Sequence, residues 1–78
     1  MTDKIVDITL HIDEETTPED RNGLCDTLLS MPGVMTAACR DKHHHLMVIE
    51  YDPDEINPKE FVIAAQQRGY HSELVGML

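Results

Sequence analysis

The sequence predicts an α+β fold: a ferredoxin-like βαββαβ sandwich, with a four-stranded antiparallel sheet and two helices on one of its faces. Three observations predict it. Residues 5–12 alternate apolar and polar side chains, as a strand with one buried face does. Helix-start signals stand at 17–20 and again at 57–60. Between the two helical segments, apolar residues at 34–40 and 45–52 flank a short polar turn, which is typical of a hairpin.

Length and charge narrow the classes of function. The 78 residues are enough for one small domain, spanning 1–78, and contain no apolar run long enough to cross a membrane. The N-terminal segment lacks the basic and apolar signature of a secretory signal, so we expect a cytoplasmic protein. The net charge of −9 argues against nucleic acid and anionic membrane as partners, and it fits a basic protein or a cation.

The first strand is predicted by its alternation. One face carries only aliphatic side chains, so we expect it to lie against a core while the other face meets water. The aliphatic positions are Val6, Ile8, Leu10 and Ile12, and the polar positions are Asp7, Thr9 and His11.

The first helix is predicted to begin with a side-chain cap and to end near Ser30. Thr17 is the expected N-cap and Pro18 suits the first helical position. Asp20 follows the cap by three residues, where its carboxylate can return the hydrogen bond.

The body of this helix should bury one apolar stripe. Leu24, Leu28 and Met31 have helical spacing. Gly23 costs about 1 kcal/mol relative to alanine inside a helix, and close packing of the helix against the sheet would explain it. The segment "MPGV" then ends the helix at Pro32–Gly33.

The hairpin strands are predicted at 34–40 and 45–52, with "DKHH" in the turn between them. Cys39 alternates inward with Ala37, as a small buried side chain does. Cys25 and Cys39 are the only cysteines; they form no C-x-x-C, and we expect both to be thiols.

The second helix repeats the start signal of the first. Asn57, Pro58 and Glu60 occupy the positions of Thr17, Pro18 and Asp20. Gly69 is the expected C-terminal stop, and "YHSELVGML" should close the chain as a short strand. The spacing places four residues on one face of this helix, namely Phe61, Ala64, Ala65 and Arg68.

Three short motifs resemble the heavy-metal-associated domain. They are "MPGV" after the first helix, "VIEYDP" at the end of the third strand, and "AAQQRGYHSELV" at the close of the chain. Their order and spacing carry the resemblance, which covers essentially the whole chain. Domains of this family occur in copper chaperones, mercury-binding proteins and metal-pumping ATPases, so the resemblance implies a role in metal handling.

The residues that bind metal in that family are absent here. The resemblance implies a C-x-x-C at the turn from the first strand to the first helix, where two thiolates suit Cu(I) or Hg(II). Counting back from Val34 places that motif on residues 17–20, and the two cysteine positions hold Thr17 and Asp20. Neither side chain supplies a thiolate, so we expect the soft-metal chemistry to be lost.

A different metal site is predicted from the other polar side chains at the same end of the sheet. His43, His45, Asp13 and Glu14 would offer nitrogen and oxygen ligands, with His71 close by. Such ligands select a borderline divalent transition metal, namely Zn(II), Ni(II), Co(II) or Cu(II), over Cu(I). The alternative is a solvated turn whose histidines only titrate, since the sequence "HHH" has no recognised ligand spacing.

We therefore predict a small binding module rather than an enzyme, acting through another protein as a monomer or weak homodimer. A metal carrier or sensor with histidine and carboxylate ligands is the first alternative. A regulatory small-molecule-binding domain that dimerises across its edge strands is the second. The open sheet face is more aliphatic than solvation requires, and its predicted side chains are Ile5, Thr9, Leu46, Val48 and Val75.

Overall fold

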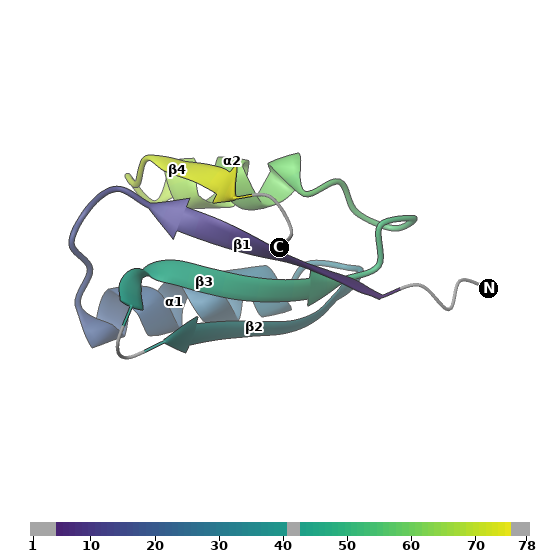
Figure 1. Ribbon diagram of the computed structural model, residues 1–78, viewed down its shortest axis with the longest axis horizontal. Coiled ribbons are helices and arrows are strands. Elements are labelled where there is room, and N and C mark those ends of the chain that lie inside the picture. Colours follow the sequence, from purple (N-terminus) through teal and green to yellow (C-terminus); the bar gives the residue numbers. More distant parts are fainter. Residues whose placement is uncertain (1–4, 41–42, 76–78) are drawn as a thin grey trace.

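The four strands form one antiparallel sheet, and both helices lie behind it in the view of Figure 1. The computed structural model describes residues 5–40 and 43–75, and for 39–40 and 43–44 it describes only the backbone. The elements follow one another as β1 (Val6–Ile12), α1 (Pro18–Leu29), β2 (Val34–Arg40), β3 (His43–Tyr51), α2 (Lys59–Gln67) and β4 (Ser72–Val75). The strand order across the sheet is β2-β3-β1-β4, which confirms the predicted ferredoxin-like fold.

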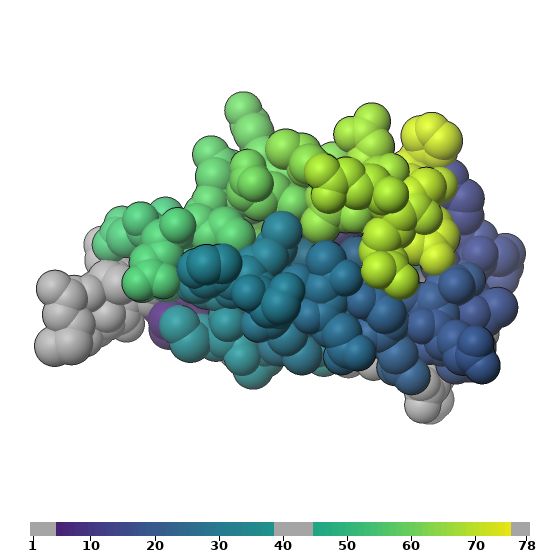
Figure 2. Space-filling view, turned by 180° about the vertical axis from the view of Figure 1, so that it is seen from behind, coloured from purple at the N-terminus to yellow at the C-terminus, as the bar shows by residue number. Residues whose placement is uncertain are grey.

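The core lies between the sheet and the helices, which cover it in the rear view of Figure 2. Alternation places Leu10 and Ile12 of β1 inside, as predicted, and Phe61 of α2 is fully buried among them. Val6 and Ile8 are partly buried and pack against the same core. Among the residues whose burial the structure describes, ten apolar ones are buried: Leu10, Ile12, Leu24, Leu28, Met47, Ile49, Tyr51, Phe61, Ala64 and Ala65. Among the described residues, no helix is long and apolar enough to cross a membrane.

The hairpin differs from its prediction at the turn. β3 begins at His43, two residues earlier than predicted, because Arg40 pairs with His43 after a register shift at the end of β2. His43 and His44 therefore belong to the strand and not to the turn, whereas His45 is in the strand as predicted; residues 41–42 lie outside the described part of the chain. The side chain of Cys39 also lies outside the described part, so its predicted burial stays a prediction.

The second helix begins and ends close to its predicted bounds. The Asn57 side chain accepts the N–H of Lys59 at 2.9 Å, but Pro58 occupies the cap position, so the predicted cap shifts by one residue. At the other end Gly69 has φ of 89°, and its N–H donates to Gln66 O at 2.9 Å, closing the helix as predicted.

One prediction about helix packing is wrong, and it concerns Gly23. Arg68, at the C-terminal end of α2, is exposed. Its guanidinium extends to α1, where it donates to Thr27 Oγ1 at 3.3 Å. A Cβ on Gly23 would meet that guanidinium and not the sheet, and the flexible arginine side chain could move aside, so close packing against the sheet does not explain the glycine.

The sheet face away from the helices has the predicted composition. Met47 and Ile49 are buried, so their neighbours on β3 point outward. The outward residues Thr9, Leu46, Val48 and Val75 are partly buried, and Ile5 is 47% exposed. This face therefore carries the predicted aliphatic side chains together with polar ones, since Asp7 pairs with Glu50 and His11 with Glu73 on the same side of the sheet.

Candidate functional site

The turn from β1 to α1 is organised by a reciprocal pair of hydrogen bonds. Asp20 N–H donates to Thr17 Oγ1 at 3.1 Å, and Thr17 N–H donates to Asp20 Oδ2 at 3.2 Å. This is the predicted capping box, with Pro18 in the first turn. These bonds lower the pKa of Asp20 below its ordinary value. Burial raises the pKa of Tyr70, and the Asp20 carboxylate beside it acts in the same direction.

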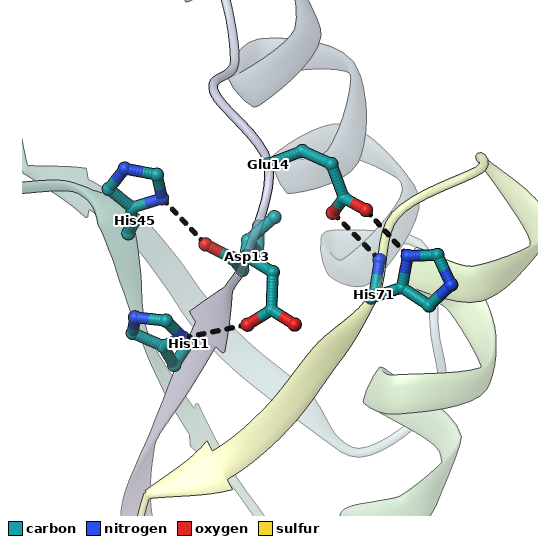
Figure 3. Close-up of polar contacts among 6 residues, drawn as sticks. His11, Asp13, Glu14, His45 and His71 are labelled. Carbon is teal, nitrogen blue, oxygen red and sulfur yellow. Dashed lines mark hydrogen bonds and ion pairs between the residues drawn. The ribbon is translucent and has the colours of Figure 1, made fainter.

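Glu14 is held by His71 rather than by another predicted ligand. One carboxylate oxygen accepts the His71 backbone N–H at 2.8 Å, and the other lies 2.6 Å from His71 Nδ1 (Figure 3). The hydrogen bonds from His71 lower the pKa of Glu14, and the bond to Glu14 raises the pKa of His71. The pair ties the β1–α1 turn to the start of β4.

His45 points at the backbone of β1. Its Nδ1 lies 2.7 Å from Ile12 O (Figure 3), and because a carbonyl only accepts, Nδ1 carries the proton. The lone pair of the neutral ring is then on Nε2, which lies 3.7 Å from a carboxylate oxygen of Glu15. A backbone carbonyl that fixes the tautomer in this way is the usual support of a metal-binding histidine.

The predicted ligand set is therefore divided among separate contacts. Asp13, Glu14 and His45 lie at one end of the sheet, as predicted, but each faces a different partner. The side chain of His43 is outside the described part of the chain.

A second group of ligand-type side chains was not predicted. His11, Asp13 and Glu73 each offer one atom, and these three atoms lie within 4.8 Å of one another. His11 and Asp13 are two residues apart on one strand and its extension, a pattern visible in the sequence. Glu73 could be added only once the pairing of β1 with β4 was known, since that register places it opposite His11.

Comparison with known proteins shows the fold. No protein-family model matches this sequence, and no curated protein matches it. Among solved structures, the N-terminal domain of a potential copper-translocating P-type ATPase from Bacillus subtilis, in its Cu(I)-loaded state, matches with a TM-score of 0.84. It is 22% identical, and the match covers 94% of this chain and 90% of that one.

Two further structures have the same architecture. Oxidized MerP from Ralstonia metallidurans CH34 matches with a TM-score of 0.82 at 15% identity, covering 94% of this chain and 100% of that one. The CopZ metallochaperone matches with a TM-score of 0.79 at 15% identity, covering 87% of this chain and 100% of that one. This chain therefore has the fold of heavy-metal-associated domains, and its functional residues have to be judged on their own chemistry.

Proposed function

We propose that this chain is a heavy-metal-associated-type domain that has lost the thiolate site and serves metal handling through contact with another protein. The fold it shares with metal-binding domains and the three motifs of the sequence support the proposal. The proposed module is cytoplasmic and has no enzymatic activity.

The capping box is the observation that carries the proposal. The resemblance assigns thiolates to positions 17 and 20, and here those side chains accept each other's backbone N–H groups. A hydroxyl and a carboxylate are poor ligands for Cu(I), which prefers thiolate and thioether sulfur. Both positions thus stabilise the start of α1 by about 1 kcal/mol, the usual contribution of a helix cap.

A gain-of-function variant tests this reasoning. Thr17→Cys with Asp20→Cys restores two thiolates at the helix start, and we expect it to retain one equivalent of Cu(I) against a chelator that strips the wild type. Thr17→Ser with Asp20→Asn is the matched control, because it keeps Cys25 and Cys39 but adds no thiolate. Wild-type protein that holds Cu(I) as firmly as the cysteine variant would overturn the proposal.

The acidic turn indicates the kind of partner. Asp13, Glu15 and Glu19 are exposed at the end of the sheet where the capping box lies. Carboxylates concentrated at one end of a chain with net charge −9 favour a partner with a basic surface.

Carbodiimide cross-linking in extracts of the source cells tests the acidic end, because it joins carboxylates directly to lysine amines. We expect a discrete adduct that Glu15→Lys with Glu19→Lys abolishes. Asp54→Lys with Glu55→Lys is the matched control, since both side chains are exposed outside the β1–α1 turn. An adduct that survives the first double variant and disappears with the second would contradict this docking site.

One observation favours the alternative of a divalent metal carrier that uses His43, His45, Asp13 and Glu14. Because Nδ1 of His45 carries the proton, the lone pair that could bind a metal is on Nε2. Tight one-to-one binding of Zn(II) or Ni(II) that disappears in His43→Ala with His45→Ala would support this function.

A dimeric regulatory domain is the second alternative, and it would use an edge strand of the sheet. β2 and β4 are the two edges, and each offers unpaired backbone groups to a second copy. Sedimentation analysis separates this alternative, which needs a stable dimer, from the proposed monomer or weak homodimer.

A further inference from the structure

We infer that His11, Asp13 and Glu73 form a binding site for one borderline divalent cation, Zn(II) or Co(II), at the paired ends of β1 and β4. The three ligand atoms lie within 4.8 Å of one another. This site shares Asp13 with the acidic end and with the alternative metal site proposed above, but its ligands include neither the capping box nor the histidines of β3.

The backbone sets these three side chains in place. His11 and Asp13 are two residues apart, so an extended chain directs both to the same side. Glu73 is the register partner of His11 across the β1–β4 pair. Asp13 lies just beyond β1, but its N–H donates to His71 O at 2.8 Å and continues the ladder by one step. Each ligand therefore comes from hydrogen-bonded backbone rather than from a loose loop.

The separation of the first two ligands already suits a metal ion. His11 Nδ1 lies 3.3 Å from Asp13 Oδ1 (Figure 3). Neighbouring nitrogen and oxygen ligands on Zn(II), each about 2.1 Å from the ion, stand about 3.0–3.4 Å apart. Asp13 and Glu73 are exposed, so rotation of their side chains can bring the third ligand to the same distance.

Nδ1 of His11, the atom that would bind the metal, has no hydrogen-bond partner. Nδ1 is buried, and its approach to Asp13 does not meet hydrogen-bond geometry. The ring is stacked on His45, with centroids 5.9 Å apart and planes at 19°. An ion between His11 and the two carboxylates would give Nδ1 a partner without moving the ring.

The ligand set determines the class of cation. One imidazole and two carboxylates suit borderline divalent ions and provide no sulfur for Cu(I). The two carboxylates balance the double charge of the ion. Three protein ligands leave at least one coordination position for water, whereas structural zinc sites have four protein ligands.

Calorimetric titration with Zn(II), and absorption and NMR titration with Co(II), test the site on the whole chain. We expect one equivalent to bind, with about a tenfold or greater loss of affinity in Asp13→Asn and in Glu73→Gln. Asp7→Asn is the matched control, because Asp7 is exposed on the outward side of the same strand and is not a ligand here. Circular dichroism confirms that each variant is folded.

The outcomes separate this site from the histidines of β3. Co(II) broadening confined to residues around 11–13 and 72–74, retained in His43→Ala with His45→Ala, supports the inference. Binding that His43→Ala with His45→Ala abolishes but Glu73→Gln leaves intact overturns it. Equal affinity for Zn(II) in Asp13→Asn, Glu73→Gln and Asp7→Asn also overturns the inference. So does the absence of binding in all three variants, because the control Asp7→Asn should still bind. None of these results depends on whether the chain binds Cu(I).

Discussion

Replacing Thr17 with alanine measures the structural role of the position where a thiolate is missing. The change removes the hydroxyl that accepts Asp20 N–H at 3.1 Å, while the carboxylate of Asp20 keeps its bond from the residue 17 N–H at 3.2 Å. Loss of an N-cap costs about 0.5–2 kcal/mol. The site is exposed, so water replaces the lost acceptor. We therefore expect the lower half of that range, about 0.5–1 kcal/mol.

Urea unfolding followed by far-ultraviolet circular dichroism measures this loss directly. For a domain of this size, about 0.5–1 kcal/mol corresponds to a fall in Tm of about 2–8 °C, with the slope of the urea dependence unchanged. Thr17→Ser is the control, because it keeps the accepting oxygen and should lose less than half as much. If serine destabilises as much as alanine, or alanine has no effect, the capping argument is refuted.

Two further predictions concern the core and the exposed ion pair. Phe61→Ala should lower the free energy of unfolding by about 3–5 kcal/mol, since Phe61 is fully buried and meets Tyr51 edge-on at 5.2 Å. Ile63→Ala on the same helix, where the side chain is 43% exposed, should change it by roughly 0.5 kcal/mol; similar losses would contradict the assigned helix face. Glu14→Gln should return the raised pKa of His71 toward its ordinary value of 6.5 in an NMR titration of the imidazole. The wild-type pair stabilises the fold fully below pH 6.5 on the His71 side, and that contribution is lost as pH rises through the raised pKa. The contribution of Glu14 to stability is lost as pH falls through its lowered pKa. A pKa of His71 that does not change in Glu14→Gln would refute the pairing.

The fold was predictable because its signals are local. Alternation along β1 separates Leu10 and Ile12 from their polar neighbours within a few residues. The box formed by Thr17 and Asp20 spans four residues, and the backbone of Gly69 adopts the positive φ expected at a helix end. Each of these features depends on neighbours in sequence, which a sequence displays directly.

Features that join distant segments were missed or misassigned. Arg68 has the helical spacing of Phe61 and Ala64, and its spacing gives no sign that its long side chain reaches α1 and bonds to Thr27. The same guanidinium lies beside Gly23, which the sequence analysis attributes to packing against the sheet. Helix-to-helix contacts between segments about forty residues apart are set by the assembled fold, not by local spacing.

The candidate site shows the same limit. Asp13, Glu14 and His45 were correctly placed at one end of the sheet, but their partners depend on register and side-chain direction. Glu73 pairs with His11 only through the alignment of β4 on β1. One residue of slip would turn Glu73 to the other face and remove it from the cluster.

Amide NMR titration of the wild-type protein with Cu(I), under reducing conditions, tests whether the thiolate site is lost. We expect no saturating shifts at residues 13–20, because the side chains of Thr17 and Asp20 bond to backbone and supply no sulfur. Shifts that saturate at one equivalent of Cu(I) and are confined to that turn would contradict it, and would show that the turn still carries a soft metal.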